Sequence, residues 1–284
     1  MSYSFYIRTG VRPAIADVLA RIDFPDIVAP DARGAWPDGT LQIYRVEIST
    51  RSTEITYENH AFQVRILALA CPEDYELAFR VVEHLAALTG AQVESEDDNT
   101  FPAQKLRDIY DATWVKRMTD SHPNFIRHFA KGEGKTVTVV GPVRKFHIGP
   151  RLYAELEVDG PADGLPLRIL EAIRRTQYRD LSGYAEAAII EATTPDKSKT
   201  IKLSVWEPDR AAHFSDIGYL HLVPNNMPDN IFLVPREALP QLAGRRFAWL
   251  DEWQCLVEAV ASNEWPELLR EAERYKVSPF EWQS

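Results

Sequence analysis

Three short stretches of alternating apolar and polar residues constrain the fold of this chain most strongly. Residues 44–48, 54–58 and 62–66 each place an apolar side chain at every second position. This is the period of a β-strand with one buried face and one solvated face. Asn59-His60 supplies a turn between the second and third stretches. We therefore expect an antiparallel meander.

The sequence that follows the meander, CPEDYELAFRVVEHLAALTG at residues 71–90, predicts a helix. Its apolar residues recur at helical spacing and form one stripe: Ala78, Val81, Val82, Leu85 and Leu88. Pro72 is harmless in a first helical turn, and the adjacent carboxylates of Glu73 and Asp74 complement the positive end of the helix dipole. Gly90 is typical of a helix end.

Strands and helices continue to mix along the rest of the chain. We expect a second helix from about Pro102 to Met118, strands at 135–140 and 151–158, and a helix at 165–175. A hairpin (184–193 with 200–207), strands at 217–223 and 230–235, and a closing helix at 264–275 complete the pattern. The order lacks strict βαβ alternation, which predicts an α+β fold. Turn residues cluster at 119–134, so we expect two packed subdomains, residues 1–120 and 131–284, each a mainly antiparallel sheet covered by amphipathic helices.

The charge of the chain restricts its partners. Asp and Glu total 42 against 32 Lys and Arg, which gives a net charge of −10. A field of this sign repels nucleic-acid phosphates and anionic lipids and favours cationic partners, although it also serves solubility. No window approaches eighteen consecutive apolar residues, the N-terminus does not resemble a secretory signal, and Cys71 and Cys255 are expected to be reduced packing residues. We expect a cytoplasmic protein that binds neither nucleic acid nor membrane.

Gly134-Lys135-Thr136 looks like the end of a phosphate-binding loop. Such a loop needs an earlier glycine at position 129, which is Phe129, and a helix after it. The residues that follow, Val137-Thr138-Val139-Val140, are typical of a strand. We expect a turn that feeds a strand, and no bound nucleotide.

Motifs for metal binding or catalysis are also missing. The chain contains no H-E-x-x-H, C-x-x-C or G-x-S-x-G pattern. Histidines that a bend could bring together as ligands are His122 with His128, and His213 with His221 and Asp216. The run PDKSKTIK at 195–202 has a nuclease-like Asp and Lys but lacks a second carboxylate at strand spacing. We therefore expect no metal, no cofactor and no recognisable catalytic residue, although carboxylates are numerous enough for acid–base chemistry.

One acidic run offers a binding surface. It comprises Glu94, Glu96, Asp97 and Asp98. These residues predict a landing patch for a basic protein partner, and the alternative is a solvated loop between a strand and a helix.

Two segments, 49–88 and 227–239, resemble bacterial domain-of-unknown-function proteins of about this length, encoded singly or beside toxin and secretion genes. The residues that carry the resemblance are Thr50, Arg51, Glu54, Tyr57, Val64, Arg65, Glu73, Asp74, Tyr75 and Val234-Pro235. The resemblance implies a bacterial cytosolic protein and names no catalytic residues. Together with the charge, it predicts a non-catalytic binding protein, foremost an immunity protein that neutralises a basic toxin domain. An enzyme of unrecognised type (hydrolase or transferase) and an accessory component of a larger bacterial assembly are the alternatives.

Overall fold

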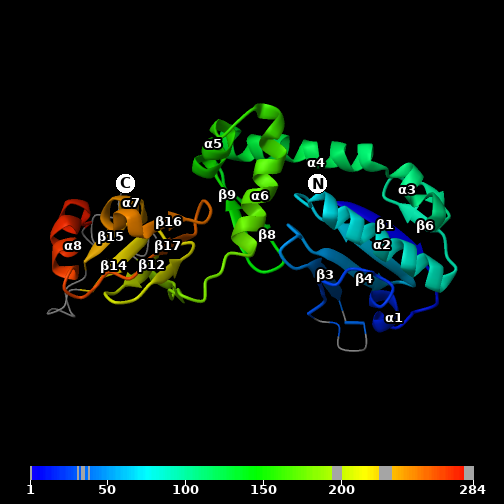
Figure 1. The fold of residues 1–284 in the computed structure, drawn as a ribbon, viewed down its shortest axis with the longest axis horizontal. Coiled ribbons are helices and arrows are strands. Elements are labelled where there is room, and N and C mark those ends of the chain that lie inside the picture. Colours follow the sequence, from blue (N-terminus) through cyan, green and yellow to red (C-terminus); the bar gives the residue numbers. More distant parts are fainter. Residues whose placement is uncertain are drawn as a thin grey trace. The chain divides into compact units, whose positions relative to one another are not determined.

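The chain divides into two compact units, residues 1–178 and 179–284. A computed structural model describes residues 2–30, 32, 36–37, 39–193, 200–223 and 232–277 (Figure 1). Both units combine helices with mainly antiparallel sheets, so the predicted α+β class is confirmed. The stretch between the two expected subdomains, residues 121–130, lies within helix α4 (Ala112–Arg127) and a π-helical turn (His128–Gly132), and the structure divides after Tyr178 instead.

The first unit is built on a seven-stranded sheet in the order β2-β3-β4-β5-β1-β6-β7, and every pair in it is antiparallel. Its strands are β1 (Tyr3–Arg8), β2 (Ile27–Val28), β3 (Thr40–Arg45), β4 (Thr53–Glu58), β5 (Ala61–Ile66), β6 (Val93–Ser95) and β7 (Thr100–Phe101). The predicted meander is present, and Asn59 and His60 make its turn with φ of 50° and 58°. The first predicted strand is shifted: β3 ends at Arg45, because Glu47 adopts a φ of 62°.

Helix α2 (Pro72–Thr89) lies across this sheet, as Figure 1 shows. The predicted stripe faces inward, where Val81, Val82 and Leu85 are fully buried. They belong to the same core as Phe5 of β1 and Val64 of β5. Gly90 ends the helix with a φ of 70°, a conformation that favours glycine.

Short helices and a hairpin complete the first unit: α1 (Ile15–Leu19), α3 (Leu106–Ile109), α4, the hairpin of β8 (Val137–Val140) and β9 (Lys145–Ile148), α5 (Pro150–Val158) and α6 (Leu165–Gln177). The prediction of a strand at 151–158 is wrong. The buried side chains there are Leu152, Tyr153 and Leu156, which is helical spacing, and Val158 is 84% exposed. Apolar residues at i and i+4 fit both periods, and Pro150 in the first turn favours the helix.

The predicted helix at 102–118 also differs from the structure. It is broken at Tyr110, and its second part continues as α4 to Arg127 despite Pro123. The α4 residues Trp114, His122 and Ile126 are buried. Burial of this face holds α4 against the rest of the unit in spite of the proline.

Helix α6 is fastened to the turn after β3. The Arg174 guanidinium donates from Nε to the Ile48 carbonyl at 2.9 Å. The Tyr178 hydroxyl lies 3.0 Å from the carbonyl oxygens of both Arg45 and Ser49. These contacts make α6 part of the first unit.

The second unit contains two four-stranded sheets in the orders β10-β13-β17-β16 and β11-β12-β14-β15. Their strands are β10 (Ala185–Glu186), β11 (Ile190–Thr193), β12 (Thr200–Trp206), β13 (Ala212–Phe214), β14 (Tyr219–Leu222), β15 (Leu233–Pro235), β16 (Phe247–Trp249) and β17 (Cys255–Val257). The pairs β10–β13 and β12–β14 are parallel, and the others are antiparallel, including the predicted hairpin β11–β12. Helices α7 (Leu239–Ala243) and α8 (Trp265–Ala272) contribute to one core in which Trp206 and Trp265 pack edge to face.

Among the described residues, no helix has the length and apolarity needed to cross a bilayer.

Candidate functional site

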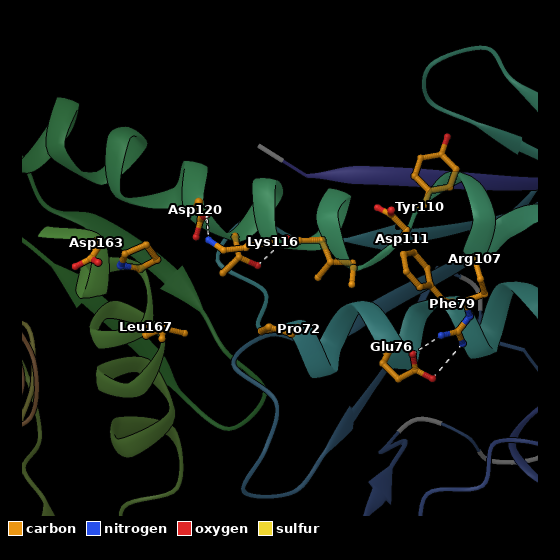
Figure 2. Close-up of a pocket in the computed structure, with 14 residues that line it drawn as sticks. Pro72, Glu76, Phe79, Arg107, Tyr110, Asp111, Lys116, Asp120, Asp163 and Leu167 are labelled. Carbon is orange, nitrogen blue, oxygen red and sulfur yellow. Dashed lines mark hydrogen bonds and ion pairs between the residues drawn. The ribbon is translucent and has the colours of Figure 1, made fainter.

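A groove of about 540 Å³ in the first unit is the candidate site. It lies between α2, the junction of α3 and α4, and the start of α6 (Figure 2). Its apolar lining comes mainly from Pro72, Phe79, Tyr110, Val115, Pro166 and Leu167. Leu167 is 65% exposed, whereas Leu165, Ile169 and Ile173 of the same helix are buried.

The deep wall of the groove is a packed aromatic cluster. Tyr110 packs edge to face on Phe5 and on Trp114, with 5.0 Å between ring centroids in each case. Phe79 contacts the same two rings at 5.9 and 6.4 Å. Since these rings belong to one buried core, the deep wall of the groove is formed by core packing and needs no ligand to assemble it.

A chain of hydroxyl groups supports Tyr110 from behind. The Tyr3 hydroxyl lies 2.9 Å from the Tyr110 hydroxyl and 2.5 Å from Asp97 Oδ2. Burial raises the pKa of Tyr3, and the hydrogen bond to Asp97 adds to the rise. Tyr3 therefore stays protonated, which lets it donate to Asp97 and accept from Tyr110.

An ion-pair ladder closes one end of the groove. Arg107 of α3 binds Glu76 with two nitrogens and reaches Glu83 through Nε at 2.8 Å. Arg80 Nε donates to Glu76 at 3.0 Å. Burial opposes ionisation of Glu76, but the hydrogen bonds from these two arginines outweigh it and hold its pKa below the usual value. The ladder joins α2 to α3 and neutralises its own charges.

The rim of the groove carries an excess of negative charge. Four carboxylates line it against two cations, a net charge of −2. Lys116 pairs with Asp120 on α4, while Asp111 caps the same helix by accepting the Trp114 N–H at 2.8 Å. Asp163 is exposed and forms no ion pair within the described residues. Asp111 and Asp163 are thus the carboxylates without a cationic partner, and Figure 2 shows them toward opposite ends of the groove.

A buried carboxylate stands next to the groove at the start of α2. Asp74 Oδ2 accepts the backbone N–H groups of Thr50 at 3.1 Å, Arg51 at 3.0 Å and Cys71 at 3.0 Å. Burial raises the pKa of the Asp74 carboxyl, and the hydrogen bonds it accepts oppose the rise. With Cys71 as N-cap, the arrangement is a capping box that also binds the β3–β4 connection. Asp74 is inaccessible, so its role is to hold backbone.

The structure places Glu94 of the predicted acidic run on strand β6 and the other three carboxylates in the turn between β6 and β7. Glu94 pairs with Arg8 Nε at 2.7 Å, Glu96 accepts the Ser4 N–H at 2.9 Å, and Asp97 binds Tyr3. The Asp98 side chain has no hydrogen bond or ion pair within the described residues. Three of the four carboxylates therefore fasten the turn to β1, and a partner-binding role for the run stays a prediction.

His213 and His221, the histidines that a bend could have brought together, lie on strands of different sheets. His213 lies on β13 within 3.2 Å of Gln254, and His221 lies on β14 of the other sheet, where Nδ1 accepts the Phe232 N–H. Asp216 pairs with Lys202. His122 is buried in α4, and exposed His128 pairs with Glu133. Within the described ranges, no group of three or more His, Cys, Asp or Glu side chains could hold a metal ion.

The other motifs have structural roles where they are described. Gly134 turns with a φ of 63° and Lys135 pairs with Glu133, so the predicted turn before strand β8 is confirmed. Cys71 and Cys255 are buried as expected, and burial raises the pKa of the Cys71 thiol. Asp196 and the lysines at 197 and 199 of the nuclease-like run lie outside the described residues.

Comparison with known families locates the groove within a recognised domain. Residues 32–180 match the model of a domain of unknown function, DUF4299. The chain belongs to this family. The match ends within two residues of the division between the two units, and it contains every residue that lines the groove. No curated protein and no solved structure matches the chain.

Sequence reasoning missed the groove because its walls come from segments spread over residues 72–167, each with an ordinary pattern of its own. One local signal was available for the neighbouring cluster. In Cys71-Pro72-Glu73-Asp74, an acidic residue stands three positions after the N-cap, which is the spacing of a capping box with Cys and Asp in place of its usual residues.

Proposed function

We propose that this protein is a non-catalytic binding protein whose first unit holds a segment of a basic partner protein, and that it acts as a cytoplasmic bacterial immunity protein against a toxin domain. The observation that carries the proposal is the groove, which combines a rigid apolar wall with rim carboxylates that lack a cationic partner. A preformed apolar groove binds by burial of apolar surface, and its acidic rim selects positive charge.

Two further features support this proposal. The net charge of −10 favours association with a cationic surface. Three titratable groups in or behind the groove wall are committed to structure: Asp74 to three backbone N–H groups, Glu76 to two arginines, and Tyr3 to Asp97. A group held by such contacts is a poor proton carrier, which leaves the rim carboxylates Asp111 and Asp163 as the groups that a ligand can meet.

The proposal is tested by recovering the partner with matched variants. Leu167→Glu puts a carboxylate on the apolar wall of the groove, while Val158→Glu makes the same change at an exposed aliphatic residue on α5, outside the groove lining. Each is purified from the native host beside the wild type, and circular dichroism checks its fold. A partner that is basic, is toxic when expressed alone, and is retained by wild type and Val158→Glu but lost by Leu167→Glu supports the proposal. The absence of such a partner, or one that ignores Leu167→Glu, contradicts it.

A further inference from the structure

We infer that the segment held in the groove is an amphipathic α-helix with a basic side chain toward each end of its apolar face. The inference rests on the proposed function, because it specifies what the groove of the first unit binds. It follows from the backbone chemistry of the groove walls and from the placement of the rim carboxylates.

The walls favour a helical segment over an extended one. The lining residues come from α2, α4, α6 and the short segments that lead into these helices, and none of them belongs to a strand. An extended peptide leaves its backbone N–H and C=O groups without partners on such a surface, because no strand edge is present to pair with them. A helix satisfies its own backbone, so it can lie on an apolar wall without that cost.

The rim determines where the positive charges of the occupant lie. Asp111 caps the N-terminus of α4, and Asp120 stands nine residues further along the same helix. At about 1.5 Å per residue, this separates Asp111 from Asp120 by about 13.5 Å along the helix axis. Figure 2 shows Asp163 on the side of Asp120, away from Asp111. Because Lys116 pairs with Asp120, Asp163 is the carboxylate without a cation at that end.

The placement of the basic residues follows from the two unpaired carboxylates. Asp111 and Asp163 lie toward opposite ends of the groove, as Figure 2 shows, so one basic side chain is needed toward each end of the occupant. The flexible stems of Lys and Arg let these side chains reach the rim from a helix that lies on the apolar wall. Between the two charges, apolar residues at i+3 and i+4 would meet Phe79, Val115 and Leu167.

Selection from a random library tests the inference without knowledge of the natural partner. A phage library of 18-residue random peptides is panned on the full chain, and the consensus peptide is synthesised with a fluorophore for anisotropy titration. We expect enriched peptides with apolar residues at helical spacing (i, i+3 or i+4, and i+7) between Lys or Arg residues toward both ends. Enrichment of extended, proline-rich or acidic peptides, or no enrichment, overturns the inference.

Substitutions then assign the contacts. Leu167→Glu should weaken binding of the consensus peptide by at least about tenfold, and Val158→Glu should not. Asp111→Asn keeps the helix cap, and with Asp163→Asn it should weaken binding about two- to fivefold for each carboxylate. Replacing the matching Lys of the peptide by Gln should abolish the effect of that variant, whereas Asp159→Asn, outside the groove lining, should have no effect.

The outcome separates this inference from the proposed function. A natural partner that is lost with Leu167→Glu, while no basic helical peptide is selected, leaves the proposed function standing and overturns the inference. Peptide binding that is insensitive to Leu167→Glu or to both rim substitutions also overturns it, because the groove would then not be the site.

Discussion

Replacing Asp74 by alanine should destabilise the first unit more than any other single carboxylate substitution near the groove. The Cys71 N–H retains a second acceptor, Thr50 Oγ1 at 2.9 Å, but the N–H groups of Thr50 and Arg51 lose their partner. A buried donor without an acceptor costs about 1–3 kcal/mol, so two of them lower the free energy of unfolding by about 2–6 kcal/mol. For a unit of this size, the melting temperature should fall by about 5–20 °C.

Two matched variants make the Asp74 prediction specific. Asp74→Asn keeps one acceptor oxygen for the backbone donors and should lose less than half as much stability as Asp74→Ala. Glu73→Gln changes the neighbouring carboxylate, which lies 3.6 Å from Arg174, and should cost less than about 1 kcal/mol.

Urea denaturation gives the free energies, and hydrogen exchange of peptides spanning residues 49–71 assigns the loss to the first unit. The reasoning is refuted if Asp74→Ala lies within 1 kcal/mol of the wild type, or if the alanine and asparagine variants are equally stable.

Three other predictions concern the same unit. Burial, with Arg51 nearby, lowers the pKa of His122 to about 4. Below pH 6.5 the folded state therefore binds fewer protons than the unfolded state. As the pH falls from 6.5 to 4, this difference should lower the free energy of unfolding by about 3 kcal/mol. Urea titrations at pH 7, 5 and 4 should show a weaker acid dependence for His122→Gln, and equal dependence would contradict the assignment. Tyr3→Phe should cost about 1–3 kcal/mol in urea denaturation and loosen the groove wall, because Asp97 and Tyr110 lose their shared partner; unchanged stability would show that the hydroxyl chain is dispensable. Replacing all four carboxylates of the acidic run (residues 94–98) by amides should slow association with a basic partner and reduce the salt dependence of the association rate. Stopped-flow kinetics can measure this rate. An association rate that changes neither with salt nor with the substitutions would remove the run as a binding surface.

Elements with an unambiguous local hydrophobic pattern were predicted correctly from the sequence. The predictions failed for elements whose conformation depends on contacts with distant segments of the chain. The stripe of Val81, Val82 and Leu85 has one periodicity only, so α2 was predicted correctly. Residues 151–158 fit two periods, and contact of Leu152 and Leu156 with the core selects the helix. The predicted helix stopped at Met118, where turn residues begin to cluster, whereas α4 continues to Arg127 because its far end is buried by residues that the local pattern does not contain.

The candidate site shows the same limit. Composition and the acidic run indicated a basic partner, which stays a proposal, but nothing local could bring Phe79, Tyr110 and Leu167 to one groove. Most of the acidic run binds β1. Its partners are Arg8, the Ser4 N–H and Tyr3, which lie about ninety residues earlier in the chain.

The contacts that hold α6 to the turn after β3 affect the order in which the first unit folds during synthesis. The Tyr178 hydroxyl reaches carbonyl oxygens 129 and 133 residues earlier in the chain. Contacts between such distant positions form late, because a large loop must close before they contribute. A nascent chain that has emerged from the ribosome only through residue 160 carries the sheet, α2 and α4, but lacks the α6 wall and its anchor. The groove is therefore completed only after the whole first unit has emerged, and a shorter nascent chain leaves its apolar wall exposed to chaperones.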